Sequence, residues 1–218
     1  DDVMSIRPQS NYEASHENTT PAGLHDLSEL PDVTGPCIAA ILDGYPVASH
    51  EALQGRIHVH EVDVKGGDVP VASRYHGTAM ASLVLHGDMH LPQEQLSRKV
   101  CLVPVLTGNP QNGQESTPKE KLAIGVIHRA LQAIVNADPE HHPDLANVTI
   151  VNHSLGDAFA PFARRPSPWA TLLDYYSHQY NLLFVVSAGN IESPVPLAEF
   201  DNLAAFEAAD PIVRQAAI

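Results

Sequence analysis

Four segments of the chain carry side chains that could act together in chemistry, and each stands at the end of an apolar run or at the start of a helical one. They are Asp43-Gly44, His76-Gly77-Thr78, Asn152-His153-Ser154-Leu155-Gly156 and Ser187-Ala188-Gly189-Asn190. An imidazole titrates near neutral pH, so His76 suits a general base that removes the proton from a hydroxyl nucleophile. A buried carboxylate at Asp43 would fix the ring tautomer, and the amide of Asn190 could donate to a developing oxyanion.

Each segment taken alone has an ordinary structural explanation. An Asp-Gly pair after a strand is most often a turn, and a histidine at the start of a helix is often a surface residue. An Ala-Gly-Asn sequence can be a loop in which the glycine permits a positive φ. Together, however, the four segments indicate a shared site, because all of them fall at the matching ends of successive predicted elements.

The elements that would position these residues alternate along the chain. Apolar runs predict strands at residues 37–42, 56–62, 100–106, 148–151 and 182–186. Helices are expected over residues 76–86, from a capping box at Thr117-Pro118-Lys119-Glu120, and after the Ser167-Pro168 cap. This alternation predicts an α/β fold of three layers, in which a mostly parallel central sheet is flanked by helices. Sites in such sheets form at the carboxyl ends of the strands.

The two ends of the chain carry weaker patterns. Residues 1–30 are polar and lack sustained periodicity, which predicts an extended leader or linker. Residues 31–218 are expected to form the folded domain. Within it, residues 197–218 indicate a loop and a helix that carries Leu203, Phe206 and Ala209.

In their order along the chain, the four segments resemble the motifs of the subtilisin-like serine peptidases, the subtilases, whose triad runs Asp, His, Ser. His76-Gly77-Thr78 matches the histidine motif, Asn152-His153-Ser154-Leu155-Gly156 resembles the cleft motif Asn-x-Ser-Leu-Gly, and Ser187-Ala188-Gly189-Asn190 resembles the oxyanion motif Ala-Ala-Gly-Asn. Asp43-Gly44-Tyr45 departs from the usual Asp-Ser-Gly or Asp-Thr-Gly, and Ser49-His50-Glu51-Ala52-Leu53 resembles Ser-His-Pro-Asp-Leu. The resemblance covers residues 37–190.

The resemblance implies a serine endopeptidase that works through an acyl-enzyme intermediate and needs no cofactor. It assigns Asp43 as the residue that orients the imidazole, His76 as the general acid and base, and Asn190 as the oxyanion donor.

The resemblance also implies a substrate cleft. Ser154, Leu155 and Gly156 would form one wall of the primary specificity pocket, where a peptide or protein substrate pairs as an added strand. Asp157 follows this wall and could favour a basic substrate side chain, or it could simply lie in solvent.

The nucleophilic serine of the family is missing from this sequence. Its motif, Gly-Thr-Ser followed by a small residue or Met, does not occur, and the single Gly-Thr pair is Gly77-Thr78. We therefore expect the N-terminal part of a subtilase domain, incomplete at its C-terminal end, with the serine and the remaining part of the domain beyond residue 218. On this interpretation the isolated chain is inactive and leaves strand edges exposed. The alternative is a non-catalytic, subtilase-like binding module that has lost the nucleophile.

Composition narrows the classes of partner. A formal net charge of −14 repels phosphate backbones, so no nucleic-acid partner is expected. No apolar run has the length to cross a bilayer, and the first residues lack the regions of a signal peptide, so no membrane partner is expected either. Cys37 and Cys101 open apolar runs, which favours buried free thiols over a disulfide. Together these features favour a cytoplasmic location, with secretion as the alternative.

Thirteen histidines raise the question of a metal site. His58 and His60 share a face of a predicted strand, yet no segment has the zinc spacing His-Glu-x-x-His, so no metal is expected. Ala52 stands where the family often supplies an aspartate ligand for calcium. A nucleotide-binding α/β domain fits the layered architecture but would need a glycine-rich phosphate loop, which the chain lacks.

Overall fold

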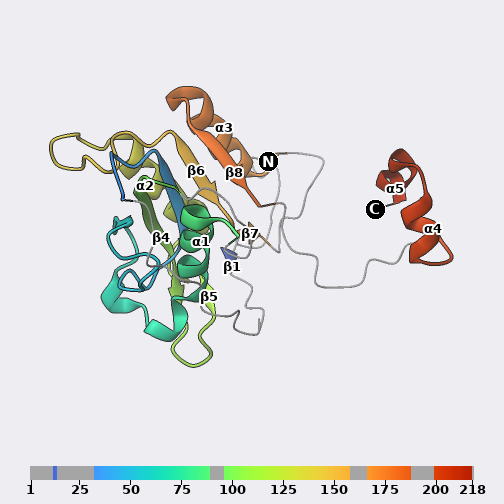
Figure 1. Cartoon of the computed structure of the whole chain (residues 1–218), viewed down its shortest axis with the longest axis horizontal. Helices are drawn as coiled ribbons and strands as arrows, with labels where there is room; N and C mark the ends of the chain where they lie inside the picture. Colours follow the sequence, from blue (N-terminus) through green and yellow to red (C-terminus); the bar gives the residue numbers. More distant parts are fainter. Residues whose placement is uncertain (1–11, 14–31, 89–95, 158–165, 188–198, 218) are drawn as a thin grey trace, which may run out of the picture. The chain divides into compact units, whose positions relative to one another are not determined.

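The computed structural model describes residues 12–13, 32–88, 96–157, 166–187 and 199–217 (Figure 1). The chain forms two compact units, Asp1–Ala188 and Gly189–Ile218. None of the helices in these described ranges combines the length and apolar character that a bilayer span requires. The expected boundary near residue 30 lies outside the described residues and stays a prediction.

A parallel sheet forms the centre of the first unit, with its strands in the order β3-β4-β2-β6-β8. The strands are β2 (Ala39–Gly44), β3 (Ile57–Val59), β4 (Val100–Gly108), β6 (Ile150–His153) and β8 (Leu183–Val186). Each of the five strand predictions is met by one of them. β2 lies in the middle of the sheet; its carboxyl end at Asp43 pairs with Pro104 of β4, whereas its pairing with β6 ends at Ile41.

A short antiparallel extension adjoins the end of β4, and the sequence patterns did not predict it. It contains β1 (Tyr12–Glu13), β5 (Glu115–Ser116) and β7 (Gly156–Asp157), with β1 paired to both β5 and β7. After β4 the chain reverses through a tight loop, in which Gly113 has a φ of 72°, and returns as β5 beside Thr107–Gly108. The turn therefore brings Glu115 back to the carboxyl end of the sheet.

Helices cover both faces of the parallel sheet, which confirms the three-layer α/β prediction (Figure 1). Side chains along β2 alternate between the faces, as a strand requires. Ile41 packs with Ala81 and Leu85 of α1 (Tyr75–His86) on one face. Ala40 and Leu42 face the other layer, built from α2 (Ala123–Val135) and α3 (Pro168–Tyr180).

The predicted start of α2 was wrong. The helix begins at Ala123, and no side chain caps it, although Thr117 to Glu120 match a capping box. Thr117 directly follows β5 and is buried, while Lys121 binds Asp63 with Nζ and Oδ1 2.8 Å apart. Strand pairing and this ion pair thus override the local helix signal. The apolar stripe of α2 is buried as predicted: Ala123, Ile127, Ala130, Leu131 and Ile134.

The predicted cap of α3 is confirmed. The Ser167 hydroxyl accepts the N–H of Ala170 at 3.1 Å, and Pro168 occupies the first turn. Leu173 and Tyr176 on this helix are buried in the core.

The second unit holds two short helices, α4 (Leu203–Ala208) and α5 (Pro211–Ala217), where one helix was expected. Asn202 caps α4 by accepting the N–H of Ala205 at 2.9 Å. The rings of Phe200 and Phe206 pack edge to face with centroids 5.2 Å apart.

The start of α1 lies so close to the end of β2 that neither Gly44 nor Gly77 has room for a side chain. A Cβ added at Gly77 would overlap the carbonyl of Gly44, and one added at Gly44 would overlap the carboxylate of Glu115. Only glycine at both positions permits this contact. The contact sets the separation between Asp43 and His76.

We predict that Gly77→Ala lowers the free energy of unfolding by about 1–3 kcal/mol, because the new methyl group forces α1 away from β2. Gly67→Ala is the matched control, since an added Cβ there meets no atom within 4 Å. Urea unfolding measures both variants, and equal stability of the two would contradict the close-approach argument.

Candidate active site

Asp43 and His76 form a hydrogen-bonded pair at the carboxyl end of the sheet. Nδ1 of His76, in the first turn of α1, lies 2.7 Å from Oδ1 of Asp43 at the end of β2. The Asp43 side chain is 0% exposed, and the His76 side chain is 13% exposed. The carboxylate is thus sealed behind the imidazole, and the ring keeps limited access to solvent.

The remaining contacts of Asp43 are few. Its Oδ1 also accepts the N–H of Gly44 at 2.6 Å, whereas Oδ2 is buried with no hydrogen-bond partner among the described residues. Burial raises the pKa of Asp43 above its ordinary value, although the hydrogen bonds from His76 and from the Gly44 N–H oppose this rise.

The pKa of His76 is also raised. Burial alone would lower it, but the hydrogen bond and charge of Asp43, together with the charge of Glu115, outweigh burial. Above this pKa the neutral ring donates through Nδ1 to Asp43. The tautomer therefore leaves Nε2 as the acceptor that a general base needs.

Glu115 is a third member of this cluster that sequence patterns did not reveal. Its side chain is only 1% exposed, and its Oε2 accepts the backbone N–H of His76 at 2.9 Å. Oε1 is buried without a hydrogen-bond partner in the described part of the chain, in contact with the bare face of Gly44. The one hint in the sequence is Gly44 itself, which stands where the subtilase motif has Ser or Thr.

Burial raises the pKa of Glu115 to about 7, and the nearby charge of Asp43 adds to this rise. The N–H donated by His76 and the His76 charge act in the opposite direction. Glu115 therefore changes charge in the pH range in which a general base must work.

The predicted cleft wall forms part of the antiparallel extension. Gly156 belongs to β7, which pairs with β1 so that Glu13 lies opposite Gly156 and Tyr12 opposite Asp157. Ser154 donates to Oδ1 of Asn152 at 2.8 Å, whereas the side chain of Leu155 is fully buried in the core. Leu155 can therefore contribute only its backbone to a cleft.

Two of the predicted positions are not fully described. Asn190, the expected oxyanion donor, lies outside the described residues. For Asp157 the structure gives the backbone pairing alone. The last described residue before Asn190 is Ser187, whose N–H donates to the carbonyl of His153 at 3.3 Å.

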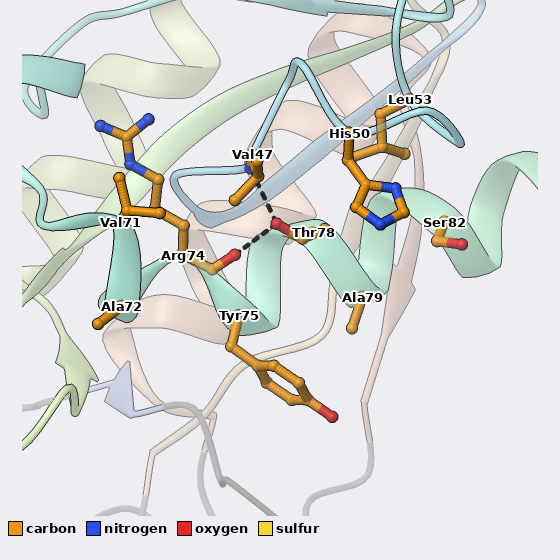
Figure 2. A pocket seen from close by; sticks show the side chains of 10 residues that line it. All are labelled: Val47, His50, Leu53, Val71, Ala72, Arg74, Tyr75, Thr78, Ala79 and Ser82. Carbon is orange, nitrogen blue, oxygen red and sulfur yellow. Dashed lines mark hydrogen bonds between the residues drawn. The ribbon is translucent and has the colours of Figure 1, made fainter. Parts of the chain in front are cut away.

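A pocket of about 340 Å³ lies against α1 (Figure 2). Figure 2 shows the Thr78 hydroxyl accepting the N–H of Val47, at 2.9 Å, and donating to the Arg74 carbonyl. Thr78 of the histidine motif thus links the segment after β2 to the first turn of α1, which carries His76. The pocket is lined by Val47, His50, Leu53, Val71, Ala72, Arg74, Tyr75, Thr78, Ala79 and Ser82.

The loops before α1 are held by a second network. The guanidinium of Arg74 stacks over the ring of Tyr45 at 4.6 Å and donates to the carbonyls of Gly66 and Val69. The Tyr45 hydroxyl donates to Oε1 of Glu61 at 3.0 Å. Arg74 directly precedes the first turn of α1, so this network helps to fix the start of the helix and with it the position of His76.

Histidines also gather away from this pair. The rings of His58 and His60 are 6.3 Å apart, those of His60 and His142 are 5.1 Å apart, and His58 Nδ1 lies 3.4 Å from Oδ2 of Asp144. Among the residues that the structure describes, no three His, Cys, Asp or Glu side chains are placed to hold a metal ion.

The two cysteines are buried free thiols, as predicted. Burial raises the pKa of both, to about 11 for Cys37. Neither thiol is therefore an activated nucleophile.

Comparisons with known proteins show the family to which the chain belongs. The model of the subtilase family matches residues 35–211. The chain belongs to the subtilase family.

Two solved structures are similar to this subtilase. One is a serine-to-alanine mutant of the protease domain of PatA, with 19% identity over 75% of this chain and 53% of that chain, at a TM-score of 0.47. The other is the patellamide maturation protease PatA, with 20% identity over 72% of this chain and 50% of that chain, at a TM-score of 0.42. The chain thus spans about half the length of each. The comparison with curated proteins gave no match.

We predict that Asp43→Asn lowers the pKa of the His76 imidazole, because the charge and the charge-assisted hydrogen bond of Asp43 favour the imidazolium. Nitrogen-15 NMR titration of the histidine rings measures this change, with a His76→Gln spectrum to assign the resonance. Asp138→Asn is the control, since Asp138 pairs with His141 at 2.6 Å on an exposed surface. A His76 titration unaffected by Asp43→Asn would contradict the coupling.

We also predict that Glu115 makes stability depend on pH. Its folded pKa of about 7 lies above the ordinary value of 4.5, so its contribution to stability is complete below pH 4.5 and is lost as the pH rises through 7. Glu115→Gln removes this loss, so its free energy of unfolding should rise relative to the wild type between those two pH values. Denaturant titrations at several pH values test this, with Glu140→Gln at an exposed position as the control. A constant difference between Glu115→Gln and wild type would refute it.

Proposed function

We propose that this subtilase is a serine endopeptidase that hydrolyses peptide bonds through an Asp-His-Ser triad and an acyl-enzyme intermediate. The observation that carries the proposal is the 2.7 Å hydrogen bond between buried Asp43 and partly exposed His76. Asp43 orients the ring, and His76 is the general acid and base.

In this mechanism, Nε2 of His76 takes the proton of the serine hydroxyl as the oxygen attacks the peptide carbonyl. Asp43 stabilises the imidazolium that forms. The imidazolium then gives its proton to the leaving amine, and an acyl-serine remains. Water hydrolyses this ester in a second cycle of the same proton transfers, which restores the serine.

The oxyanion and the substrate backbone need partners of their own. We assign the amide of Asn190 as the oxyanion donor, on the resemblance of Ser187-Ala188-Gly189-Asn190 to the family motif. The position between β5 and β7 is the proposed binding site for an extended peptide or protein substrate. The pairing of β1 with both strands supports this, because an extended segment of the chain itself occupies this position and a substrate strand would take its place.

We propose that the nucleophilic serine lies beyond residue 218, in a remaining part of the peptidase domain, and that the isolated chain is inactive. The absence of a Gly-Thr-Ser motif supports this. So does β8, the last strand of the sheet in the described part of the chain, on which Leu183 is 60% exposed and Val185 is 50% exposed, as expected of a sheet that continues. Two buried free thiols support a cytoplasmic location.

We predict that His76→Ala abolishes labelling of the intact protein by a fluorophosphonate probe, because the serine loses its general base. Gel fluorescence after a timed incubation measures the labelling. His141→Ala, in an exposed turn, is the control and should label like the wild type.

Two outcomes would count against the proposal. Full labelling of His76→Ala would show that His76 is not the general base of the catalytic centre. A wild-type protein that does not label, yet binds peptides, would favour the non-catalytic binding module.

A further inference from the structure

We propose that Glu115 is a positioning residue of the peptidase centre: it holds the start of α1 against the end of β2 and controls how readily His76 takes up a proton. This inference rests on the proposed function and deepens it, since it assigns a role to a residue outside the triad. Geometry and charge support the two parts of the role separately.

The first part concerns the backbone at His76. The helix α1 has no side-chain cap of its own, since Arg74 at the N-cap position makes no such bond. The carboxylate of Glu115 arrives from β5 and accepts the N–H of His76, 2.9 Å away. A carboxylate at this end of a helix satisfies a donor that would otherwise lack a partner and opposes the positive end of the helix dipole. Glu115 therefore anchors the turn that carries the catalytic imidazole.

The second observation is the fit between Glu115 and Gly44. The carboxylate occupies the space directly over Gly44, so that any side chain at residue 44 would collide with it. The subtilase motif has Ser or Thr at this position, whereas this chain has glycine. The glycine at residue 44 thus makes room for the buried carboxylate, and Glu115 occupies the space beside Asp43 that a side chain at residue 44 would fill.

The charge of Glu115 acts on the imidazole. Two buried carboxyl groups contact His76 of α1: Asp43 of β2 is hydrogen-bonded to Nδ1 of its ring, and Glu115 of β5 accepts its backbone N–H. Among the described residues, Asp43 and Glu115 are the charged groups that raise the pKa of His76, and Asp43 and His76 are the charged groups that shift the pKa of Glu115. When Glu115 is ionised, its charge favours the imidazolium, so more of His76 is held in the form that cannot act as a base.

The test measures the rate of inactivation of the intact protein by a fluorophosphonate as a function of pH, which requires no knowledge of the substrate. The rate follows the neutral, basic form of His76 in the free enzyme. Glu115→Gln keeps an acceptor for the His76 N–H but carries no charge. We expect its plateau rate to be close to that of the wild type and its acid limb to lie lower by about half a pH unit or more.

Glu115→Ala separates positioning from charge. It removes the acceptor, so we expect a plateau rate about tenfold lower, which Glu115→Gln restores. Glu140→Gln should match the wild type in both respects. Melting temperatures show whether Glu115→Ala folds; if it does not, loss of the fold with its retention in Glu115→Gln still supports the anchoring role.

Each result decides one part. A Glu115→Gln profile that superimposes on the wild type would overturn the control of protonation, and a Glu115→Ala plateau equal to the wild type would overturn the positioning role. In both cases, labelling that still requires His76 would leave the peptidase proposal intact. Labelling of His76→Ala at the wild-type rate would instead remove the centre on which the role of Glu115 depends.

Discussion

The rest of this structure depends on one hydrogen bond, which joins a carboxylate that has no access to water to an imidazole that keeps some access. Removal of an ionised carboxyl group from water costs several kcal/mol unless hydrogen bonds and opposite charge offset it. Asp43 has two such donors, the ring of His76 and the N–H of Gly44, and both act on the same oxygen. The arrangement is stable only if the end of β2 and the start of α1 are held in fixed positions.

Several elements share this task. Gly44 and Gly77 let the two backbones meet, Thr78 ties the segment after β2 to α1, and Arg74 fixes the loops that precede the helix. Glu115 completes the frame from β5, the strand that also pairs with β1. The strand that borders the proposed substrate position therefore also supplies the residue that holds the base, so both depend on the hairpin that follows β4.

Sequence patterns predicted most of this frame because parallel strands and amphipathic helices have strong local signals. The apolar runs ending near Leu42 and Val186 and the helix at His76 follow directly from periodicity, and motif order predicted that Asp43 and His76 would meet. The start of α2 failed because Thr117 is fixed by the neighbouring strand β5, which no local pattern shows. Glu115 was missed for a related reason: a glutamate in a polar loop resembles a solvated residue, and only the reversal after β4 buries it.

The most direct test of this account is a crystal structure of the intact protein labelled with a fluorophosphonate. The account predicts that the phosphonate is covalently attached to one serine beyond residue 218. The Oγ of this serine should lie about 2.6–3.2 Å from Nε2 of His76, and Asp43 should still be hydrogen-bonded to Nδ1. A label on a serine remote from His76, or an imidazole turned away from Asp43 in the labelled enzyme, would contradict it.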